Sequence, residues 1–195
     1  NIIAQGGLEG GDGGFIETSS KINLQAFGDG GAGALNGKPG LWLLDPVNVE
    51  IVSAVPGGLE YQFGIFDYVT PAGVARGWIF SPGLLPTGSG AVPALGSQIS
   101  AKFISDRLNG TSSLGPNNVA ITTENPDPAN IYDGDITVSA GITWNKSTTL
   151  RLRADDDIFI NAPINGTGGA VLELFSQQSG LDAGDVGIAT QTATI

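Results

Sequence analysis

A repeat with a constant offset is the feature of this sequence that most restricts its fold. The segment Asp135–Ile142 aligns with Asp157–Ile164, and Leu150 aligns with Leu172 at the same offset of 22 positions. The matched apolar residues alternate along the chain, as on a strand with one buried face, whereas the polar residues between them differ. Successive turns of a coil that stack their apolar side chains keep such an interval. The repeat therefore predicts an all-β fold, a right-handed parallel β-helix.

Three apolar blocks in each repeat predict about three short strands per turn. The blocks lie around Ile136, Ile142 and Leu150. Glycines between the blocks supply the tight corners: Gly134, Gly141, Gly166, Gly168 and Gly169. A β-sandwich is the alternative, because its strands also alternate and its turns also use glycine. Nothing in a sandwich requires a fixed offset between matched strands, so the β-helix is favoured.

An earlier pair of segments extends the pattern toward the first residue. Ile22 and Leu24 align with Val49 and Ile51 at an offset of 27 positions, which predicts a longer turn with a larger loop. The last stretch, Gly187–Ile195, breaks off in a strand-like pattern. We therefore expect a coil that begins near residue 1 and belongs to a fragment of a longer polypeptide.

The segment between Ser53 and Gly96 interrupts the repeat and is rich in proline and aromatic residues. Within it, Leu59–Ile65 and Val74–Phe80 alternate between apolar and other residues, and Thr70–Gly73 lies between them. Alternation on both sides of a proline- and glycine-containing turn predicts a β-hairpin. This segment is therefore interpreted as an insertion into the coil.

The stretch from Gln98 to Asn109 predicts one short amphipathic helix. Ser97 precedes it as an expected N-cap, and Asn109 with Gly110 forms an expected stop. Its apolar residues follow helical spacing: Ile99, Phe103, Ile104 and Leu108. We expect coil turns in residues 1–52, the hairpin and helix in 53–110, and further coil turns in 111–195, all within one domain.

Composition excludes several classes of function. The net charge of -11 leaves little basic surface for a phosphate backbone, so nucleic acid is not an expected partner. The absence of His and Cys removes the common nucleophile machinery, thiolate metal ligands and disulfides. Apolar runs fall far short of the roughly 18 residues of a membrane-spanning helix, so membrane insertion is not expected either.

Two sequence motifs resemble motifs of a known protein family. Gly13–Ser19, followed by Leu41–Ile51, closely resembles a pair of motifs in large exoproteins of two-partner secretion, which include filamentous haemagglutinin and the high-molecular-weight adhesins. In those adhesins the second motif is followed by a variable insertion, by repeats similar to Asp135–Ile164, and by a strand similar to Gly168–Leu174. The resemblance covers most of the chain except the insertion.

The resemblance implies a non-enzymatic, rod-like shaft. Such a shaft is exported through an outer-membrane secretion pore and displayed on the cell surface, where it attaches to a glycan or protein of a host or neighbouring cell. The secretion domain of such proteins does not lie within these residues. A structural filament built by end-to-end self-association is the first alternative, and a carbohydrate-active β-helix enzyme is the second.

Two sets of residues are candidates for contact or modification. The hairpin aromatics concentrate apolar area in a segment that leaves the shaft, which makes them the candidate partner-binding surface: Tyr61, Phe63, Tyr68, Trp78 and Phe80. The alternative is that they attach the hairpin to the coil. Three Asn-x-Ser/Thr triplets predict glycosylation sites: Asn109, Asn145 and Asn165.

Carboxylates offer the remaining candidate chemistry. Asp155–Asp157 follows Arg151 and Arg153, an arrangement that serves a catalytic groove or a charged, solvated corner. Calcium is a further alternative at Gly10–Gly14 and Asp182–Asp185, although calcium-binding nonapeptides need several consecutive copies and none recurs. We therefore expect no catalytic residues, no metal site and no cofactor.

Overall fold

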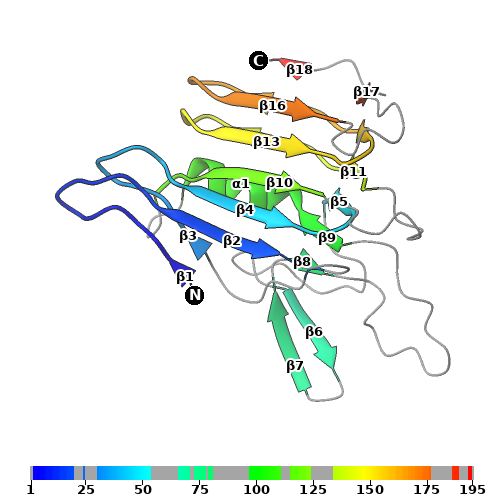
Figure 1. Ribbon diagram of the computed structural model, residues 1–195, viewed down its shortest axis with the longest axis horizontal. Coiled ribbons are helices and arrows are strands. Elements are labelled where there is room, and N and C mark those ends of the chain that lie inside the picture. Colours follow the sequence, from blue (N-terminus) through cyan, green and yellow to red (C-terminus); the bar gives the residue numbers. More distant parts are fainter. Residues whose placement is uncertain are drawn as a thin grey trace.

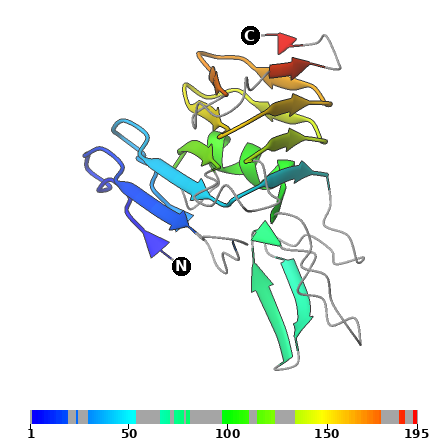
Figure 2. The ribbon, with the colours of Figure 1, turned by 45° about the vertical axis from the view of Figure 1, so that its right-hand side comes forward.

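In the computed structural model, the described residues form mainly parallel β-sheets and one short helix (Figure 1). From a strand of a five-stranded sheet the chain enters a six-stranded sheet, then a three-stranded sheet, and returns to the first. Figure 2 shows successive passages of the chain through these sheets stacked above one another, and each such passage is one winding. The structure describes residues 2–19, 24, 30–53, 66–70, 73–77, 79–80, 97–110, 115–123, 134–176, 186–188 and 193–194.

The five-stranded sheet is parallel throughout. Its order is β16 (Val171–Phe175), β13 (Thr149–Arg153), β10 (Asn118–Thr122), β4 (Leu41–Asp45) and β2 (Phe15–Ser19). Leu150 pairs with Leu172, and Leu152 pairs with Leu174. The predicted offset is therefore confirmed in this sheet as direct strand pairing.

The six-stranded sheet repeats the same offset. Its order is β17 (Val186–Ile188), β14 (Ile158–Ile160), β11 (Ile136–Val138), β5 (Val49–Val52), β9 (Ser97–Ser100) and β8 (Ile79–Phe80). Ile136 pairs with Ile158, and neighbouring strands are parallel except β8 and β9, which are antiparallel.

Two smaller sheets complete the stacked part. The three-stranded sheet is parallel and contains β12 (Ile142–Trp144), β15 (Ile164–Gly166) and β18 (Ala193–Thr194). Ile142 pairs with Ile164, again at the offset that the repeat predicts. A two-stranded sheet joins β1 (Ile2–Ile3) to β3 (Gly30–Gly31) in parallel.

The core lies between the sheets and is formed by the alternate residues that the repeat matches. Ile136, Ile158 and Leu150 are fully buried, whereas the residue between the two isoleucines of β14, Phe159, is exposed. Each buried aliphatic side chain contributes about 1.5–3 kcal/mol by leaving water, so the stacked columns are the main source of stability.

The alignment of Ile22 and Leu24 with Val49 and Ile51 was wrong. In the sheet, β5 pairs with β9 on one side and with β11 on the other, so no position beside it remains for an earlier strand. The backbone N–H of Leu24 instead donates to Ser97 Oγ at 2.9 Å, and Ile22 lies outside the described residues. The insertion returns a strand, β9, that occupies the expected place.

The predicted hairpin is present, with its strands placed differently. β6 (Phe66–Thr70) pairs antiparallel with β7 (Gly73–Gly77), and Thr70 faces Gly73 across the turn as predicted. The expected first strand, Leu59–Ile65, lies outside the described residues. The expected second strand divides, because its last residues form β8 and pair with β9 instead of β6.

The helix α1 (Ala101–Asn109) begins later than predicted. Ser100, not Ser97, is its N-cap, and Ser100 Oγ accepts a hydrogen bond from the N–H of Phe103 at 3.4 Å. Sheet pairing overrides the earlier cap because β9 holds the preceding residues in an extended conformation against β5. The predicted end is confirmed, since Gly110 has a φ of 76°.

Candidate functional site

The predicted partner-binding surface lies only partly within the described residues. Figures 1 and 2 both show the β6–β7 hairpin extending away from the stack. Tyr68 lies on β6 and Phe80 on β8, while Tyr61, Phe63 and Trp78 lie outside the described residues. β8 joins the six-stranded sheet through β9.

Three carboxylates meet at one corner of the stack. Oxygen atoms of Asp135, Asp156 and Asp157 lie within 4.8 Å of one another, and all three residues are half-buried. Asp135 directly precedes β11, and the other two directly precede β14, so adjacent windings bring them together. The N–H of Asp157 donates to Asp135 Oδ1 at 3.1 Å, which links the two windings.

The sequence interpretation grouped Asp155, Asp156 and Asp157 and left out Asp135. The signal for Asp135 was available, because Asp135 precedes Asp157 by the same offset that separates Ile136 from Ile158. Calcium takes six to eight oxygen ligands, so three carboxylates provide only part of such a shell. The corner is therefore an acidic surface that bridges windings.

Arg151 pairs with a carboxylate of the neighbouring strand, Glu173. It pairs in register with Glu173 on the next strand, and its Nε lies 2.5 Å from Glu173 Oε2. Both side chains are partly exposed, so this ion pair contributes at most about 1 kcal/mol.

The proposed calcium loop near the amino terminus has a different contact. Asp12 Oδ1 accepts the backbone N–H of Lys38 at 2.9 Å, and the N–H of Gly13 donates to the carbonyl of Lys38. Asp12 therefore ties one glycine-rich loop to the next. The other proposed calcium segment, Asp182–Asp185, lies outside the described residues.

The three asparagine candidates occupy different environments. Asn145 is exposed in the connection between β12 and β13, and Asn165 is half-buried on β15. Asn109 ends α1, and its side-chain amide is engaged on both sides. Its Nδ2 donates to the carbonyls of Ser105 at 2.8 Å and Thr143 at 3.2 Å, and its Oδ1 accepts from the N–H of Asn145 at 2.9 Å.

Where native material carries sugar on this chain, we expect Asn145 to be modified and Asn109 to be unmodified. A glycosidic bond at Asn109 Nδ2 replaces one of the two hydrogens that it donates, whereas the Asn145 side chain faces solvent. Peptide mapping of secreted, folded material by mass spectrometry measures the occupancy of each residue. Stoichiometric modification of Asn109 in folded protein contradicts this expectation.

Within the described ranges, no helix is long and apolar enough to cross a membrane. A scan against protein-family models and a search of curated proteins found no match to this sequence.

Proposed function

We propose that this chain is a segment of a right-handed parallel β-helical shaft from a secreted bacterial surface adhesin of the two-partner-secretion type. It carries out no reaction, and it binds a glycan or protein on the surface of a host or neighbouring cell. The observation that carries the proposal is the in-register stacking of windings at one constant offset, with Ile136 on Ile158, Ile142 on Ile164 and Leu150 on Leu172.

The stacking supports a shaft because the three sheets repeat in the same chain order. Strands of neighbouring windings lie about 4.8 Å apart, so each added winding lengthens the stack by that amount. The windings also share polar contacts. Asn118 Oδ1 accepts the N–H of Thr149, and its Nδ2 donates to the carbonyl of Pro39, so one side chain joins three windings. A repeated unit of this kind suits an extended surface structure.

The position of the two family-like motifs also supports the proposal. The strand in the first motif, β2, pairs with the strand in the second motif, β4, and Phe15 lies opposite Leu41. Trp42 is buried, and its Nε1 donates to Thr18 Oγ1 at 3.0 Å. The two motifs therefore form one pair of strands in adjacent windings. Proteins that share both motifs are expected to share the coil.

The projecting hairpin supports a role in attachment. It extends away from the stack (Figure 2), where it meets a partner without disturbing the wall of the coil. Aromatic residues are enriched among the side chains that dominate binding energy at protein interfaces. The proposed location is extracellular, at the cell surface, after passage through the outer-membrane pore.

Binding of fluorescently labelled protein to cultured cells tests this function. We expect saturable binding, and we expect Trp78→Ala to weaken it about tenfold or more without changing the melting temperature. Prior treatment of the cells with glycosidase or protease identifies the partner as glycan or protein. Phe159→Ala is the control, because Phe159 is an exposed aromatic residue on the stack.

Two results contradict the proposal in different ways. Absence of saturable binding by the folded protein to any cell type opposes adhesion itself. If Trp78→Ala lowers the melting temperature while its folded fraction binds normally, the aromatic residues attach the hairpin to the coil and the binding surface lies elsewhere.

A further inference from the structure

One edge of the three-stranded sheet faces helix α1 instead of a strand. The backbone groups of Ile142 and Trp144 bond to the β15 side, through the carbonyl of Pro163 and the N–H of Thr167. The alternate residues, Thr143 on β12 and Asn145 directly after it, therefore direct their backbone groups to the other edge. An exposed row of such groups is a template for pairing with another strand.

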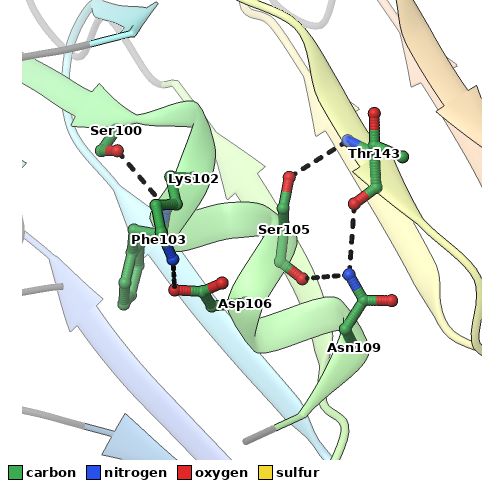
Figure 3. A network of polar contacts seen from close by, with 7 residues as sticks. All are labelled: Ser100, Lys102, Phe103, Ser105, Asp106, Asn109 and Thr143. Carbon is green, nitrogen blue, oxygen red and sulfur yellow. Dashed lines mark hydrogen bonds and ion pairs between the residues drawn. The ribbon is translucent and has the colours of Figure 1, made fainter. Parts of the chain in front are cut away.

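Side chains of α1 bind these edge groups. Ser105 Oγ accepts the N–H of Thr143 at 3.1 Å, and Asn109 Nδ2 donates to the carbonyl of Thr143 at 3.2 Å, as Figure 3 shows. Asn109 Oδ1 accepts the N–H of Asn145 at 2.9 Å. Ser105 and Asn109 are one helical turn apart, which places both on one face of the helix.

The bonds of Asn109 follow the pattern of a parallel β-ladder. In such a ladder, a residue opposite position i donates its N–H to the carbonyl of i−1 and accepts the N–H of i+1. With Trp144 as position i, the Asn109 amide makes both bonds, to Thr143 and to Asn145. The side-chain amide therefore replaces the backbone peptide of a neighbouring strand.

We propose that α1 is a strand surrogate: the side chains of Ser105 and Asn109 take the place of a neighbouring strand's backbone and protect the β12 edge from solvent. This inference is independent of the adhesive function.

Other contacts hold α1 in place when the Asn109 amide is removed. Phe103, Ile104 and Leu108 are fully buried, and Phe103 packs edge-on against Trp42 with ring centroids 5.4 Å apart. The carbonyl of Leu108 also accepts a hydrogen bond from Thr148 Oγ1 at 2.9 Å. The edge bonds are therefore removable in a folded protein.

The test compares Asn109→Leu, which keeps side-chain size, with Lys102→Leu on the exposed side of the same helix. Lys102 pairs with Asp106 at 2.7 Å, away from β12 (Figure 3). Hydrogen exchange measured by NMR reports the N–H groups of Thr143 and Asn145 individually. We expect Asn109→Leu to accelerate exchange at Asn145 about tenfold or more and Lys102→Leu to leave both amides unchanged.

A second variant completes the test. Ser105→Ala is expected to accelerate exchange at Thr143 and to leave Asn145 protected, which applies also if Asn109→Leu fails to fold. Combined Ser105→Ala and Asn109→Leu is expected to accelerate exchange at both amides. Unchanged exchange at both amides overturns the surrogate.

Discussion

Replacement of Ile158 by aspartate is expected to unfold the protein. Ile158 is fully buried, and its register partners on the two neighbouring strands are Ile136 and Val186. A carboxylate at this position has no partner in the apolar column, and burial of an unpaired charge costs on the order of 5 kcal/mol or more. Domains of this size are stable by about 5–15 kcal/mol, so the folded population is largely lost.

The adjacent residue provides a matched control. Phe159 is on the same strand, β14, but points outward and is 37% exposed, so Phe159→Asp adds the same charge to solvent. Circular dichroism and urea titration are expected to show a cooperative transition for Phe159→Asp and none for Ile158→Asp. A folded Ile158→Asp protein with a urea midpoint near that of its control contradicts the stacked apolar column.

The structure changes the expected effect of aspartate at two positions that the repeat treats as equivalent to others. The repeat alone predicts that Leu172 is as critical as Ile158, but Leu172 is half-buried because β16 is the last strand of its sheet among the described residues. The alternation also predicts that Ser139 tolerates aspartate. Ser139 Oγ donates to Glu50 Oε1 at 2.8 Å, so a carboxylate there faces another carboxylate. Sequence periodicity gives the face of a strand, and it does not give cross-winding neighbours.

The stacked strands were predictable because the signal is local and repeated. Two windings separated by a constant interval need only their own residues to specify the pairing of Ile136 with Ile158. The return of the insertion as β9 has no such signal. Its pairing with β5 joins Val49 to Ser97 across the whole insertion. No repeated pattern in the intervening sequence indicates that these two residues pair. The misplaced Leu24 and the early helix start both follow from this non-local strand.

The candidate site was predictable in part for a related reason. The turn chemistry of the hairpin and the asparagine triplets are short patterns, and each was located from the sequence. The role of Asn109 depends on Thr143 and Asn145, which lie 34 and 36 positions farther along the chain and which the fold brings to the end of the helix. The asparagine of a triplet that resembles a modification site therefore binds a strand edge, which only the three-dimensional contacts reveal.

Replacement of Gly13 by alanine is expected to destabilise the protein by about 3 kcal/mol or more. A Cβ atom at Gly13 would overlap the carbonyl oxygen of Ala32 and would lie 2.5 Å from the backbone nitrogen of Gly40. Both neighbours are backbone atoms of the next winding, and that winding is fixed by the hydrogen bond from the N–H of Gly40 to the carbonyl of Ala32. The methyl group is therefore accommodated only by separating two windings.

Gly141→Ala is the control for this effect, because a Cβ there meets only the carbonyl oxygen of Pro163, at an ordinary 3.5 Å. We expect its urea midpoint to stay close to that of the parent protein, since alanine also reduces the freedom of the unfolded chain. Equal stability of Gly13→Ala and Gly141→Ala contradicts backbone contact between the first windings. A large difference supports a packing rule for this corner: glycine is required at position 13 by the spacing of neighbouring windings, whereas Gly141 is replaceable.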